Sequence, residues 1–227
     1  MAERKTMKYK IYLVEYLGVH GATMDYLRSL KGILERISGV DVEILSNFSD
    51  TPGRDPFLVN QYDGRVWNKV VSLYRNYRRL SRLIDEYPEA IYIFVTYGNQ
   101  IDISFIRILS KARHHVVDVR DLAAPEEAET AEMLYVFAKT YSHFTSCVIS
   151  HAAFTDEFLM EIDYTGKVFH LPKTLCDSEE CASNDSFQTS ASGKMIQKFV
   201  KSFSVWLERG NVIGEDYDDG DDNPYNT

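Results

Sequence analysis

The chain of 227 residues is 44% apolar and carries a formal net charge of −9. This length and apolar content predict one large domain, or one domain with appendages, whose core is large enough to fold without disulfides or metals. Six acidic residues lie between Glu215 and Asp222, and removing them leaves only −3, so no general nucleic-acid-binding surface is indicated.

The cysteines and the amino-terminal segment exclude further classes. Cys147, Cys176 and Cys181 form an odd set without metal-ligand spacing, so we expect no metal site and no disulfide framework. The first ten residues are polar and charged, and no stretch approaches the roughly 18 apolar residues of a membrane span. We therefore expect a cytoplasmic protein without a transmembrane segment.

Short apolar runs, each followed by polar or glycine residues, alternate with stretches of helical periodicity. The runs predict strands over residues 9–14, 40–45, 91–95, 116–119, 146–149 and 167–171. The periodic stretches predict helices over residues 22–37, 66–87, 101–112, 125–141, 152–161 and 194–209. This alternation favours parallel strands joined by right-handed crossovers. We predict an α/β fold, namely a Rossmann-like, doubly wound, mostly parallel sheet of about six strands with helices on both faces.

Composition divides the chain into four parts. Residues 1–174 hold all the predicted strands and form the Rossmann-like domain. Residues 175–193 are rich in Ser, Asn and Asp and predict a polar linker or loop. Residues 194–210 predict an amphipathic helix that packs back on the domain, and residues 211–227 predict an acidic, disordered tail.

The residues that follow the strands are the candidates for a site, because the ligand crevice of an open parallel sheet lies beyond its carboxyl ends. After the first strand, Gly18, His20 and Gly21 would let backbone N–H groups approach a substrate or an anion. A turn that only needs a positive φ explains the same glycines. The dinucleotide fingerprint G-x-G-x-x-G is absent.

The third strand is followed by Tyr97 and Asn99. A tyrosine ring can stack on a sugar while an asparagine amide bonds the sugar hydroxyls. We therefore interpret both as substrate-binding residues, although a generic loop would have the same composition.

The fourth strand carries the most suggestive cluster. Asp118 and Arg120 alternate with valines, so they share one face of the sheet. Asp121 follows at the crevice, where a carboxylate can act as a general base or hold an arginine in place. A structural ion pair between aspartate and arginine is the alternative.

Histidines occur at both edges of the predicted sheet. His151 follows the fifth strand, where it suits a base or a phosphate ligand, and His20 would face it across the crevice. A turn histidine with a purely structural role is the alternative. His114 and His115 precede a strand, so we expect them at the opposite edge.

The helix over residues 66–87 carries a basic face, made of Arg75, Arg78, Arg79 and Arg82. Together with the intervening Tyr74 and Tyr77 this face suits anionic lipid headgroups. A solvated helix face is the alternative.

The segment Asp118-Val-Arg-Asp-Leu122, at the end of a predicted buried strand, resembles the amino-terminal domain of family 4 glycosyltransferases with the GT-B fold. The order of parts over residues 8–174 is similar too, with a glycine-containing loop after the first strand. The resemblance implies two Rossmann-like domains, of which the first mostly binds the acceptor and the second binds the nucleotide-sugar. Two features differ from the family: Val19 and His20 separate glycines that are usually paired, and no donor-binding motif follows.

The resemblance implies a glycosyltransferase-like protein of surface polysaccharide, capsule or glycoconjugate biosynthesis, in which this chain is the acceptor-binding half. The donor-binding half would be a separate subunit, so we expect no cofactor on this chain and a nucleotide-sugar only with the partner. The acceptor would be a lipid-linked saccharide, which implies peripheral contact with the inner face of the membrane. The implied catalytic residues are Asp121 and His151, and the implied substrate-binding residues are Gly18, His20, Gly21, Tyr97, Asn99 and Arg120.

Two other hypotheses stay open. One is a degenerate domain that binds a glycan or a partner protein without catalysis. The other is an unrelated flavodoxin-like or Rossmann-like module that binds a nucleotide or an anion.

Overall fold

The computed structural model describes residues 9–15, 22–47, 57–58, 66–97, 103–120, 147–151, 153–161, 163–172, 175 and 190–209. Within these residues the strands form one six-stranded, all-parallel sheet in the order β2-β1-β3-β4-β5-β6. The strands are β1 (Tyr9–Val14), β2 (Val40–Leu45), β3 (Ile91–Tyr97), β4 (His114–Arg120), β5 (Cys147–Ser150) and β6 (Lys167–His170).

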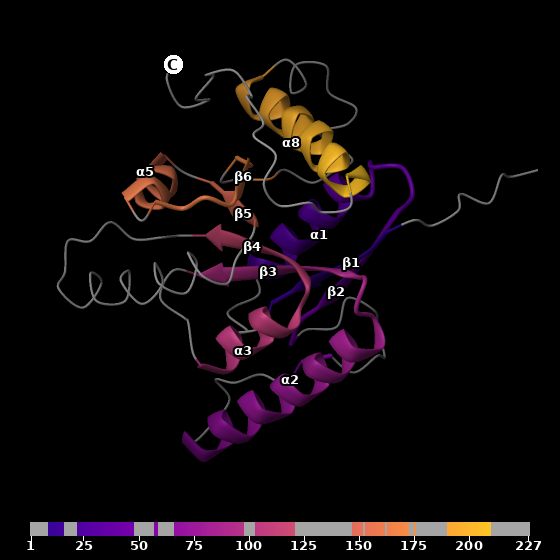
Figure 1. Ribbon diagram of the computed structural model, residues 1–227, viewed down its shortest axis with the longest axis vertical. Coiled ribbons are helices and arrows are strands. Elements are labelled where there is room, and N and C mark those ends of the chain that lie inside the picture. Colours follow the sequence, from indigo (N-terminus) through magenta and orange to yellow (C-terminus); the bar gives the residue numbers. More distant parts are fainter. Residues whose placement is uncertain are drawn as a thin grey trace, which may run out of the picture.

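Helices cover both faces of this sheet (Figure 1). They are α1 (Ala22–Leu34), α2 (Val66–Glu86), α3 (Ile103–Lys111), α5 (Ala153–Glu161) and α8 (Ala191–Glu208). One buried core joins α1 and α8 to one face, and a second core joins α2, α3 and α5 to the other. The fold is therefore the predicted Rossmann-like, doubly wound α/β architecture.

The strand sequences explain why the sheet is buried on both sides. Along β1, Ile11 and Leu13 lie in the α1–α8 core, whereas Tyr12 and Val14 lie in the α2–α3 core. A strand covered on both faces needs a continuous apolar run rather than an alternating one. The run over Ile11–Val14 meets that need, and it sets β1 inside the sheet.

The strand order creates a topological switch point. Ile11 of β1 pairs with Val42 of β2 on one side and with Ile91 of β3 on the other. The chain therefore winds outward from β1 in both directions, as in flavodoxin-type sheets, and such sheets bind ligands beyond the carboxyl ends of the strands near this point.

Helix α8 packs on the sheet and on α1. Phe199 and Phe203 of α8 are buried against Phe169 of β6, with ring centroids 5.9 and 5.2 Å from it. The helix begins three residues earlier than predicted, because the side chain of Ser190 caps it by accepting a hydrogen bond from the backbone N–H of Gly193 at 3.1 Å.

Several strand boundaries also differ from the prediction, and those of β3 and β4 differ most. β3 continues to Tyr97, and β4 begins at His114, two residues before the apolar run. His115 is tolerated there because its Nδ1 lies 2.7 Å from the carbonyl oxygen of Ala112. Both histidines lie at the amino-terminal edge of the sheet, as expected. The predicted helix over residues 125–141 lies outside the described residues.

Candidate functional site

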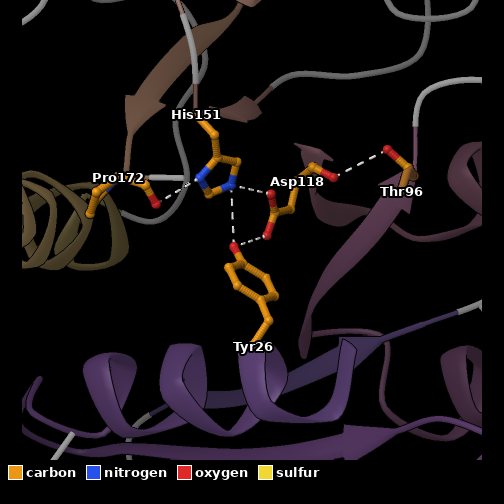
Figure 2. Close-up of polar contacts among 5 residues, drawn as sticks. All are labelled: Tyr26, Thr96, Asp118, His151 and Pro172. Atoms are coloured by element: carbon orange, nitrogen blue, oxygen red, sulfur yellow. Dashed lines mark hydrogen bonds and ion pairs between the residues drawn. The ribbon is translucent and has the colours of Figure 1, made fainter. Parts of the chain in front are cut away.

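Three polar side chains from separate elements meet near the carboxyl ends of β4 and β5 (Figure 2). Val116 of β4 packs in the α1–α8 core, so Asp118, two residues further, points from the same face toward α1. There it contacts Tyr26 of α1, whose neighbour Leu27 holds the helix against the sheet. His151 follows β5 directly and approaches the same carboxylate.

Asp118 is completely buried, and its oxygen atoms are all in hydrogen bonds. Oδ2 accepts from the Tyr26 hydroxyl at 2.5 Å, and Oδ1 lies 2.6 Å from Nε2 of His151. Its backbone oxygen accepts from Oγ1 of Thr96 at 3.1 Å. These bonds offset the cost of removing a carboxylate from water and fix the end of β4.

Both ring nitrogens of His151 are occupied. Nδ1 lies 3.3 Å from the carbonyl oxygen of Pro172, which can only accept, so Nδ1 carries a hydrogen. Nε2 faces Asp118, so one proton lies between the imidazole and the carboxyl group. The His151 side chain is only 3% exposed. This geometry suits a residue that positions its neighbours better than one that removes a proton from a substrate.

Pro172 reaches His151 because the pairing of β5 and β6 continues past the strand ends. The backbone N–H of Leu171 donates to the carbonyl oxygen of Ser150 at 3.0 Å. His151 follows Ser150, and Pro172 follows Leu171. The carbonyl oxygen of Pro172 therefore lies close to the imidazole of His151.

Arg120 completes the site. Its guanidinium carbon lies 3.7 Å from the centroid of the Tyr26 ring, within the range of a cation–π contact. Arg120 is partly exposed, whereas Asp118 and His151 are buried. We call Tyr26, Asp118, Arg120 and His151 the Asp118 cluster. In it a positive charge sits at the surface above a buried hydrogen-bonded network.

A second histidine lies close to this cluster. His170 of β6 has Nδ1 3.6 Å from Oδ2 of Asp156 on α5. Burial lowers the pKa of the His170 imidazole, and the Asp156 carboxylate only partly opposes this effect. The lowered pKa favours the neutral ring, so His170 adds little positive charge beside His151.

The structure describes three of the predicted site residues. It brings Arg120 and His151 together through Tyr26 and Asp118. It pairs the backbone of Tyr97 with that of Arg120 across β3 and β4. The other predicted residues lie outside the described part of the chain: Gly18, His20, Gly21, Asn99 and Asp121.

Comparison with known proteins assigns no family. No protein-family model matches the chain, and no curated protein matches it in sequence. Within the described residues, no group of three or more His, Cys, Asp or Glu side chains could hold a metal ion, and no helix is long and apolar enough to cross a bilayer.

The sequence interpretation missed Tyr26. A tyrosine on the core-facing stripe of a helix reads as an ordinary core residue. The sequence nevertheless indicated that such a partner exists, because Asp118 is a carboxylate within an apolar strand. A buried carboxylate requires hydrogen-bond donors from neighbouring elements.

Replacing Tyr26 with phenylalanine is expected to lower the free energy of unfolding by about 1.5–3 kcal/mol, the value of a hydrogen bond to a charged group. The variant keeps the ring that Arg120 covers and removes only the hydroxyl, which donates to Asp118 and lies 3.2 Å from Nε2 of His151. Urea unfolding followed by circular dichroism measures the change. Tyr74→Phe is the control, because Tyr74 is 59% exposed. Equal stability of both variants would contradict the importance of this bond.

Proposed function

We propose that the chain binds a saccharide acceptor at the carboxyl edge of the sheet and is the acceptor-binding half of a family 4-like glycosyltransferase. One observation supports the proposal. The segment that resembles this family, Asp118 to Leu122, begins in a fully buried hydrogen-bonded carboxylate and continues into a partly exposed arginine at the edge where such sheets bind ligands.

Two residues of this segment and the nearby His151 have proposed roles. Asp121 is the proposed general base, or orients the acceptor hydroxyl. Arg120 offers its guanidinium to a phosphate or carboxylate of the acceptor. His151 acts as a positioning residue, since both of its ring nitrogens are already bonded.

The remaining parts of the proposal come from the resemblance. Gly18, His20 and Gly21 form the acceptor loop, and Tyr97 and Asn99 contact the sugar. A separate subunit supplies the nucleotide-sugar. The acceptor is a lipid-linked saccharide for a surface polysaccharide, and the chain works at the cytoplasmic face of a membrane.

Asp121→Asn is expected to reduce sugar transfer at least a hundredfold, roughly the low end of general-base contributions. The assay uses extracts of cells that lack their own copy of the chain, supplemented with purified variant and a radiolabelled nucleotide-sugar, and counts label in the lipid fraction. Asp85→Asn, an exposed carboxylate at the other edge, is the matched control. Transfer by Asp121→Asn at the wild-type rate would contradict the proposed role.

A second candidate function is a binding module without catalysis. The observation that favours it is the buried, doubly bonded His151, which leaves no histidine of the cluster available as a base. Calorimetric titration with a short-chain prenyl diphosphate disaccharide and with a uridine diphosphate sugar separates the functions. Saccharide binding without transfer in the extract favours this second function. Binding of the nucleotide-sugar alone favours a nucleotide module and contradicts both.

A further inference from the structure

Helix α2 exposes an unusual number of large apolar side chains. Among the described residues, five large hydrophobic side chains are exposed, and three lie in the first half of α2: Val70 at 51%, Val71 at 44% and Tyr74 at 59%. The opposite side of α2, with Leu80 and Ile84, is buried in the core. The exposed apolar side chains are therefore not needed to hold the helix on the sheet.

Arginines flank these apolar side chains. Arg75, Arg78 and Arg82 are exposed, and the guanidinium carbon of Arg78 lies 5.7 Å from the ring centroid of Tyr74. Positions 71, 75, 78 and 82 follow a spacing of three and four, so they form one stripe along the helix. No acidic residue occurs in α2 before Asp85. We call Val70, Val71, Tyr74, Arg75, Arg78 and Arg82 the α2 stripe.

The apolar end of the stripe lies toward the carboxyl edge of the sheet, on the face opposite the Asp118 cluster. β2 and β3 are both parallel to β1, so α2 begins at the carboxyl edge of the sheet and runs back to the amino edge. Val70, Val71 and Tyr74 thus lie toward the edge that holds the Asp118 cluster. Figure 1 shows α2 on the outer side of the molecule, across the sheet from α1 and α8.

We propose that the α2 stripe docks the chain on the surface of an anionic lipid bilayer. Arginines bind lipid phosphates, while valines and a tyrosine enter the interfacial layer. Nucleic acid would use the arginines but would leave the two valines in water. The chain as a whole carries −9, so contact with an anionic surface requires a local basic patch of this kind. This inference rests on the proposed function, because docking would bring the chain to a lipid-linked acceptor, which lies at a membrane.

The test is cosedimentation of the purified full chain with vesicles of equal parts phosphatidylcholine and phosphatidylglycerol. The expected result is binding to these vesicles, no binding to pure phosphatidylcholine, and weakening by added salt. Replacing Arg75, Arg78 and Arg82 with glutamine is expected to weaken binding roughly fivefold for each arginine, or roughly a hundredfold together.

A matched control changes the same charge elsewhere. Lys194, Lys198 and Lys201 are exposed on α8, and their replacement with glutamine is expected to leave vesicle binding unchanged. A second variant, Val71→Asn with Tyr74→Asn, keeps the arginines and is expected to weaken binding, whereas Met160→Asn on α5 does not. This variant keeps the test informative where the arginine variant folds poorly.

Three results would overturn the docking proposal. They are failure of the wild-type chain to bind the mixed vesicles, equal losses from the α2 and α8 variants, and tighter binding to duplex DNA than to vesicles at the same salt. Vesicle binding needs no sugar, acceptor or partner subunit. If the chain binds vesicles but supports no sugar transfer, the result therefore counts against the proposed function alone. If it supports transfer but does not bind vesicles, the result counts against docking alone.

Discussion

Asp118→Ala is expected to lower the free energy of unfolding by about 3–5 kcal/mol, the range for removing one partner of a buried, hydrogen-bonded pair. The substitution removes the acceptor of both Tyr26 and His151 in a place that water does not reach. Urea unfolding measured by circular dichroism gives the change.

Two companion variants show whether the loss comes from the network. Asp118→Asn keeps one oxygen acceptor, so its loss should be smaller than that of alanine. Asp85→Ala breaks an exposed pair with Lys111, which is expected to cost less than about 1 kcal/mol. If Asp118→Ala were as stable as Asp85→Ala, the buried network would contribute nothing to the fold.

The second large effect is expected at the aromatic contact between α8 and β6. Phe203→Ala should lower the free energy of unfolding by about 3–5 kcal/mol, because the lost ring leaves a cavity. Phe203 is fully buried, and its ring centroid lies 5.2 Å from that of Phe169 and 5.3 Å from that of Phe199. Urea unfolding again measures the change, together with the rate at which a protease cuts α8.

Lys201→Ala is the control for this helix. Lys201 is exposed on α8, and its replacement is expected to change stability by less than about 0.5 kcal/mol. A loss in Phe203→Ala no greater than that in Lys201→Ala would mean that α8 adds little to the domain.

The sequence predicted the sheet well where apolar runs end sharply. β1 and β2 have the predicted bounds, and Gly39, with φ of 81°, makes the turn before β2. Prediction was less accurate where polar residues continue a strand, as Thr96 and His114 do. Such residues are accepted only because neighbours bond them in the fold, and no local pattern contains that information.

The candidate site was predictable in part for the same reason. The two-residue period of a strand placed Asp118 and Arg120 on one face. It did not identify their partners, since Tyr26 lies 92 residues from Asp118 in the sequence. In the structure the Asp118 carboxyl group bonds Tyr26 and His151, while Arg120 covers the Tyr26 ring.

The central place of β1 has a consequence during translation. β1 leaves the ribosome before the other strands of the sheet, but Ile11 pairs with Ile91, 80 residues later. At roughly 5–20 residues per second, β1 waits roughly 4–16 s for that partner. During this time the apolar run over Ile11–Val14 can pair only with β2 and lacks its neighbour on the other side, which makes the nascent chain a candidate for chaperone binding and for slow, non-local folding.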